Sequence, residues 1–142
     1  MLLNPSTATE MRNDPTIERC ERRARRLGHP GLCVVNLFAF RATAPAALKR
    51  AAAPVGPDND AILAEAAAET AAGGGAALCG WGAHGRHRGR SAEVGGLLRG
   101  LGVPLFHLGL TRDGEPRHPL YVPYAVRPQP WIVPPASKNS SN

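Results

Sequence analysis

The sequence predicts one small α/β domain, a three-layer fold in which an open, mostly parallel β-sheet carries helices on both faces. Short apolar runs rich in β-branched and aromatic residues recur along the 142-residue chain, which is typical of strands buried on both faces. Amphipathic segments with helix-start and helix-stop residues separate these runs, and that alternation implies right-handed crossovers between parallel strands. The length fits one domain with one core.

The first predicted helix begins after Asp14, which can cap it, and has Pro15 at its first position, where a missing N–H costs nothing. Gly28 is its predicted stop. One face of this helix carries five arginines: Arg19, Arg22, Arg23, Arg25 and Arg26. We interpret this run as a solvated face, and a stripe that faces phosphate groups is the alternative.

Three strands and three further helices are predicted downstream. The strands are expected at residues 32–40, 76–81 and 103–108, and the first of them is expected to be buried on both faces. A short helix is expected within residues 45–53. Asp58 and Ser91 are expected to cap the other two helices. Their predicted inward residues are Ile62, Leu63, Ala66 and Ala67 in the first, and Val94, Leu97, Leu98 and Leu101 in the second.

The predicted domain spans residues 1–128, and residues 129–142 are rich in Pro and then in Ser and Asn, which favours a flexible tail. Residues 3–7 have the composition of a loop that leaves a strand, but almost no strand precedes them. We therefore expect the first strand to be truncated.

Composition favours a soluble cytoplasmic protein with an anionic partner. The net charge is +6 and the pI about 10, which fits nucleic acid or phosphate, although Arg-rich coding bias would give the same balance. No apolar run could span a membrane and no signal peptide is evident. The three cysteines, Cys20, Cys33 and Cys79, are widely spaced and are expected to be buried free thiols. Neither a metal nor a cofactor is expected.

Polar residues collect after the predicted strands, where open α/β sheets bind their ligands. We expect Asn4, Asn36, His84 and His118 to lie around one crevice at this edge. His84 lies between glycines, which fits either close approach of a ligand or a tight turn with an exposed histidine. His118 precedes a proline and is therefore held extended.

The remaining candidates line the same predicted crevice. Trp81 and Tyr121 are either core residues or walls on which a base stacks. Asp14 and Asp113 are the carboxylates best placed for the crevice. The predicted substrate-binding residues are Asn36, Arg41, Trp81, His84, Thr111 and Tyr121.

Five segments together resemble a family of bacterial proteins, domain-of-unknown-function family 1643. They are residues 3–8, 14–17, 34–39 with Arg41 and Thr43, 81–85, and 118–121, and they cover almost all of the chain up to about Pro123. The resemblance implies no activity. It implies an apolar strand before residues 3–8, in keeping with a truncated first strand.

A more distant resemblance is to the uracil-DNA glycosylase superfamily, which excises flipped bases on an α/β sheet. It rests on the Asn-Pro loop at Asn4, the strand end at Asn36 and the His-Pro pair at His118. The resemblance implies that Asn4 positions water, that His118 stabilises the leaving base and that Asn36 reads the base edge. Ser6 and Thr7 replace the acidic or glycine-rich form of that loop. The predicted catalytic residues are Asn4, Asp14 and His118.

Three functions remain open on the sequence. The first is an N-glycosylase-like enzyme that acts on DNA or a nucleotide, and the second is a non-catalytic nucleic-acid or nucleotide binding module. Both predict that Asn4, His84 and His118 meet beside Trp81. The third is a hydrolase or transferase of a small phosphorylated metabolite, which predicts an anion pocket with Arg41 or Arg112 and no slot for a flat ring.

Overall fold

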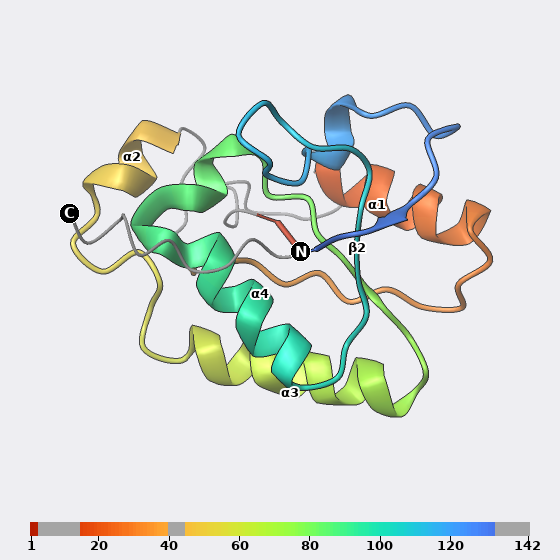
Figure 1. The fold of residues 1–142 in the computed structure, drawn as a ribbon, viewed down its shortest axis with the longest axis horizontal. Helices are drawn as coiled ribbons and strands as arrows, with labels where there is room; N and C mark the ends of the chain where they lie inside the picture. Colours follow the sequence, from red (N-terminus) through yellow and green to blue (C-terminus); the bar gives the residue numbers. More distant parts are fainter. Residues whose placement is uncertain (3–14, 40–44, 133–142) are drawn as a thin grey trace.

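A computed structural model describes residues 1–2, 15–39 and 45–132 (Figure 1). The elements in chain order are α1 (Pro15–Arg26), α2 (Pro45–Arg50), α3 (Asn59–Ala72), β1 (Ala77–Leu78), the 3₁₀ segment η2 (Ala83–Gly89), α4 (Arg90–Gly100), β2 (Leu105–His107), the 3₁₀ turn η3 (Pro119–Tyr121) and β3 (Gln129–Pro130). The structure is therefore a mixed helix-and-strand domain with short strands.

The three named strands form one mixed sheet in the order β1-β2-β3. Strands β1 and β2 are parallel, with Ala77 opposite Leu105, so the parallel pairing predicted for these two runs is confirmed. The crossover between them passes through η2 and α4. Strand β3 is antiparallel to β2 and places Gln129 opposite His107.

The first predicted strand, residues 32–40, is wrong in extent. Its one ladder contact within the described part of the chain is an isolated parallel bridge between Asn36 and Leu2. Leu37 and Phe38 are fully buried, but Leu32 is 49% exposed and Cys33 is exposed as well. The apolar run therefore supplies fully buried core residues at its end only, because no strand within residues 1–2, 15–39 and 45–132 pairs with its first half.

Met1 and Leu2 lie between the segment at residues 35–37 and strand β1. The Leu2 amide donates to the Val35 carbonyl and the Leu37 amide donates to the Leu2 carbonyl, both at 2.9 Å. On the other side, the Met1 amino group donates to the Leu78 carbonyl at 2.6 Å. Burial lowers the pKa of that amino group. These two residues thus join the 35–37 segment to the sheet.

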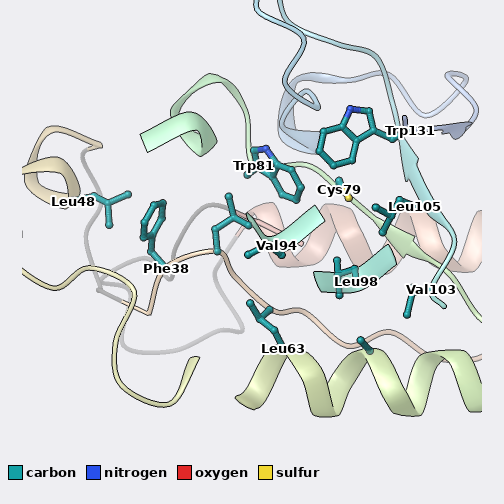
Figure 2. Packing of buried hydrophobic residues seen from close by; sticks show 12 residues of the cluster. Phe38, Leu48, Leu63, Cys79, Trp81, Val94, Leu98, Val103, Leu105 and Trp131 are labelled. Carbon is teal, nitrogen blue, oxygen red and sulfur yellow. The ribbon is translucent and has the colours of Figure 1, made fainter. Parts of the chain in front are cut away.

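Helices α3 and α4 contribute the main apolar side of the core, shown in Figure 2. Leu63, Ala67, Val94 and Leu98 are buried there as predicted. Ile62 is 52% exposed and Leu101 is 39% exposed, so their predicted inward positions are wrong. On both helices, the face that packs against the core is therefore narrower than the stripe of apolar residues in the sequence.

One of the two predicted cap positions is observed and the other is wrong. Asp58 is the N-cap of α3, but its side chain makes no capping hydrogen bond. Ser91 is buried inside α4, whose N-cap is Gly89 in the left-handed conformation. A left-handed residue at this position suits glycine, because a side chain there is strained.

The C-terminal part of the described chain packs against the sheet. Gln129 and Pro130 form β3, and Trp131 is 5% exposed, with its amide bonded to the Leu105 carbonyl at 2.9 Å. This differs from the expected flexible tail at these residues, because Trp131 buries its indole against Trp81 with ring centroids 5.3 Å apart.

The sequence led us to expect that all the arginines of α1 are solvated, and this expectation is wrong for Arg23. Arg23 is 3% exposed, and one of its terminal nitrogens donates to the Val122 carbonyl at 2.7 Å. Arg19 donates to the same carbonyl at 2.6 Å. These bonds attach α1 to the segment that follows η3.

Candidate functional site

A basic pocket of about 510 Å³ opens beside η2. Its lining comes from α2, from η2 and from the loop after β2, and comprises Lys49, Ala83, His84, Arg86, His87 and Asp113. Because β1 and β2 are parallel, η2 and the loop after β2 both leave the carboxyl edge of the sheet. The pocket therefore occupies the edge at which a ligand was expected.

Two glycines shape the turn into η2. Gly82 has φ 76°, a conformation that favours glycine. A Cβ on Gly85 would lie 2.0 Å from Cδ1 of Trp81. The backbone therefore lies so close to the indole that only glycine fits at this position. His84 lies between these glycines and is turned out to solvent.

Arg88 connects η2 to the end of α2. It is the one described non-glycine residue with positive φ, at 56°, and its guanidinium donates to the Ala51 and Ala52 carbonyls at 3.2 and 3.1 Å. Because α2 carries Lys49, this link keeps the lysine beside η2.

The pocket is lined by two permanently charged side chains, Lys49 and Arg86, and by two histidines that favour the neutral state. Desolvation and the charge of Lys49 lower the pKa of His84. Desolvation, with Arg88 and Lys49, lowers the pKa of His87. Arg86 pairs with Asp113 at 3.5 Å across an exposed contact. The lining thus combines the fixed positive charges of Lys49 and Arg86 with two histidines whose pKa values are lowered, which favours the neutral imidazole at pH 7.

His87 is partly a structural residue. Its ring lies 5.7 Å from that of Phe38, and its Nε2 is buried without a hydrogen-bond partner among the described residues. An unpaired buried nitrogen is costly, so Nε2 of His87 is a site at which an additional hydrogen bond would be favourable.

A buried polar network holds the carboxyl end of the 35–38 segment. Nδ2 of Asn59 donates to the Asn36 and Leu37 carbonyls at 3.0 and 2.9 Å. Arg90 donates to the Leu37 carbonyl at 2.7 Å and pairs with Asp60 and Glu93 at 2.6 and 2.5 Å. The backbone after Asn36 is thus fixed to α3 and α4 by groups that the sequence did not single out.

Trp81 and Thr111, two of the predicted substrate-binding residues, both make contacts that support the loops. Trp81 is 1% exposed, and its Nε1 donates to Oε1 of the buried Glu115 at 2.8 Å, so no base can stack on it. Oγ1 of Thr111 accepts from the Glu115 amide at 3.1 Å and closes the loop after β2. Both residues thus help to hold the loops in place, and the substrate-binding role predicted for Thr111 stays a prediction.

His118 is extended, with ψ 130°, as its place before Pro119 predicts. Its Nδ1 accepts the Leu120 amide at 3.2 Å and caps η3. The ring lies 5.7 Å from that of Tyr121, which is 73% exposed. His118 is not part of the pocket lining, although its Cβ would lie 3.9 Å from a Cβ placed on Gly82.

Three predicted site residues, Asn4, Asp14 and Arg41, lie outside the described residues. Of the others, His84 and Asp113 line the pocket, and Asn36 is half-buried at the bridge to Leu2. The convergence of all four predicted loops stays a prediction. The pocket lining also contains three residues that were not predicted from the sequence: Lys49, Arg86 and His87. The run of basic residues after the Trp81–Gly85 segment was the available signal.

The described part of the chain contains no group of three His, Cys, Asp or Glu side chains that could hold a metal. No helix within residues 1–2, 15–39 and 45–132 is long and apolar enough to cross a membrane.

The fold and the site define a mixed helix-and-strand domain with a basic, histidine-bearing pocket beside its parallel strands. Residues 1–120 match the model of a family described as protein of unknown function (DUF1643), and the chain belongs to that family. No curated protein and no solved structure matches the chain.

Proposed function

We propose that the protein binds a nucleotide and holds its phosphate groups in the basic pocket. The observation that carries the proposal is the gathering of Lys49, His84, Arg86 and His87 around one opening, where Asp113 is the single carboxylate among the described lining residues. The volume of about 510 Å³ falls in the range of roughly 300–1,000 Å³ that small-molecule sites occupy. A net charge of +6 would steer anions toward the protein.

His84 extends this proposal from binding to chemistry. It is exposed, its pKa is lowered, and it lies beside Lys49 and Arg86 in the lining. A neutral imidazole can accept a proton from an attacking water or hydroxyl while the cations stabilise charge on phosphate. A hydrolase or transferase of a phosphorylated metabolite is the reaction class that this arrangement favours.

Calorimetric titration with nucleoside mono- and diphosphates tests the binding. Lys49→Ala and Arg86→Ala should each weaken the affinity about tenfold or more, since a hydrogen bond to a charged group is worth about 1.5–3 kcal/mol. Arg99→Ala removes the same charge from an exposed position on α4 and is the matched control. Equal weakening by all three variants would indicate a net-charge effect and contradict the pocket.

A second candidate function is base excision by a three-layer, uracil-DNA-glycosylase-like fold, and one observation on His118 favours it. Because Nδ1 accepts the Leu120 amide, the neutral imidazole carries its proton on Nε2, where it could donate to a leaving base. The parallel pair β1 and β2 and the parallel bridge of Leu2 to Asn36 fit such a sheet.

Base release from uracil-, hypoxanthine- and alkyl-base-containing oligonucleotides tests this second function. We expect His118→Gln to lower release on the order of a hundredfold, as loss of a preorganised donor does. A melting curve of the same variant separates this loss from unfolding. Absence of release by the wild-type protein across the panel would exclude the reaction.

A further inference from the structure

The arginines of α1 fall into two sets with different surroundings. Arg22 pairs with Glu18 at 3.1 Å, and Arg25 lies 3.9 Å from Glu21. The other three converge on one aromatic ring: the guanidinium carbons of Arg19, Arg23 and Arg26 lie 4.2, 5.2 and 5.2 Å from the centroid of Tyr124. Among the described residues, no carboxylate lies within ion-pair distance of this second set.

Neutral backbone groups hold two of these cations in place. Arg19 donates to the Pro119 and Val122 carbonyls at 3.1 and 2.6 Å, and Arg23 donates to the Val122 carbonyl. Carbonyl oxygens and a tyrosine ring orient guanidinium groups but cancel none of their charge. Burial, and then the charge of Arg19, lower the pKa of Arg23. The three positive charges are thus held close together by neutral groups, which would attract an anion to this face.

An exposed aromatic ring lies next to this cluster. Tyr121 is 73% exposed and belongs to η3, which packs against α1. Arg19 donates to the carbonyl of Pro119 in the same turn. Figure 1 shows η3, in blue, beside one end of α1, whereas α2 with Lys49 of the pocket lies on the other side of the view. No residue of α1 or η3 lines the basic pocket.

We propose that this face binds single-stranded nucleic acid, with a base stacked on Tyr121 and the sugar-phosphate backbone along Arg19 and Arg26. We call it the arginine–tyrosine surface; it comprises Arg19, Arg26, Tyr121 and Tyr124, and the buried Arg23 adds its charge close to Tyr124. Single-strand binding combines a cationic track with aromatic rings on which unpaired bases stack, and both parts are present here. The inference is independent of the nucleotide proposed for the pocket, because the two sites share no lining residue.

The two parts of the surface predict different experimental signatures. A phosphate contact is a counterion-release term, so its loss lowers the salt dependence of binding. A stacking contact is insensitive to salt, so its loss weakens binding at every salt concentration alike. Arg26 and Tyr121 are the best probes because both side chains are exposed, and their replacement leaves the core intact.

The test is fluorescence anisotropy of a labelled 20-nucleotide oligo-dT with the full chain, over a series of salt concentrations. Arg26→Ala should weaken binding several-fold and reduce the slope of log K against log salt by about 0.7, the value for one phosphate contact on a single strand. Tyr121→Ala should weaken binding about tenfold with an unchanged slope. The controls are Arg99→Ala and Leu101→Ala, which remove an exposed charge and an exposed apolar side chain near the end of α4.

Several results would overturn the proposal. These are no binding by the wild-type protein, equal losses in Arg26→Ala and Arg99→Ala, or a Tyr121→Ala variant that binds as the wild type does. A duplex of the same length that binds as tightly as the single strand would contradict base stacking. Loss of oligo-dT binding in Arg86→Ala alone would assign the nucleic acid to the basic pocket. The nucleotide titration with Lys49→Ala and Arg86→Ala tests the pocket separately.

Discussion

The two sides of the segment from Trp81 to Arg90 differ in what their residues do. On the inner side, Trp81, Gly85 and Arg90 are buried and tightly contacted. On the outer side, His84 and Arg86 are exposed and line the pocket. One short motif thus combines a buried support with exposed polar side chains, and neighbours in sequence do not share a role.

The largest effect is expected on the inner side. Trp81→Ala should lower the free energy of unfolding by about 3–5 kcal/mol, because it removes a buried indole, its contact with Trp131 and the partner of Glu115. Chemical denaturation measures this change. A loss below about 1 kcal/mol would mean that Trp81 is not the support of the pocket.

A smaller loss is expected at the polar end of the same support. Arg90→Met should destabilise by about 1–3 kcal/mol, since it removes one of the two buried donors to the Leu37 carbonyl and leaves only the Asn59 amide there. Glu93→Gln is the control: its side chain is 65% exposed, and exposed ion pairs contribute roughly 0–1 kcal/mol. Equal losses in the two variants would contradict the primary role given to the buried carbonyl contact.

Acid should weaken the fold through buried histidines. Burial lowers the pKa of His107 and of His87 below 6.5, so between the folded and unfolded pKa values the unfolded chain binds more protons. This contribution to stability is present above pH 6.5 and is lost as the pH falls below it. Melting curves from pH 7.5 to 5 should show the decline, and His107→Gln should reduce its slope. An unchanged slope would exclude His107 as a source.

The smallest stability effect is expected on the outer side. His84→Ala should change the free energy of unfolding by no more than about 0.5 kcal/mol, as exposed substitutions do. Nucleotide binding by the wild type should strengthen as the pH falls below 6.5, because protonated His84 adds a charge, and the variant should lose part of that pH dependence. A dinucleotide phosphodiester is the suitable ligand, since its own charge stays constant in this range. A stability loss comparable with Trp81→Ala would erase the difference between the two sides.

Local signals in the sequence located most elements. These signals depend on contacts within a few residues. They are the helix starts at Asp58 and Pro15, the apolar spacing of Leu63 and Ala67, and the apolar segments that form β1 and β2. The strand predicted at residues 32–35 is not observed. An apolar run forms a strand only when a neighbouring strand supplies hydrogen bonds, and composition does not reveal whether such a strand is present. At the site, His84 and Asp113 were found, while Lys49 was missed because it comes from a separate helix.

The sequence by itself determined the alternation of helices and strands, the parallel crossover, the extended backbone at His118 and the excess of positive charge. Each follows from local sterics, hydrophobic periodicity or charge counting. The tertiary structure alone decided that Trp81 is core, that three arginines surround Tyr124 and that Lys49 faces His84. Those outcomes depend on which distant segments meet, and the free energy of such contacts is set by packing and desolvation, which no local pattern encodes.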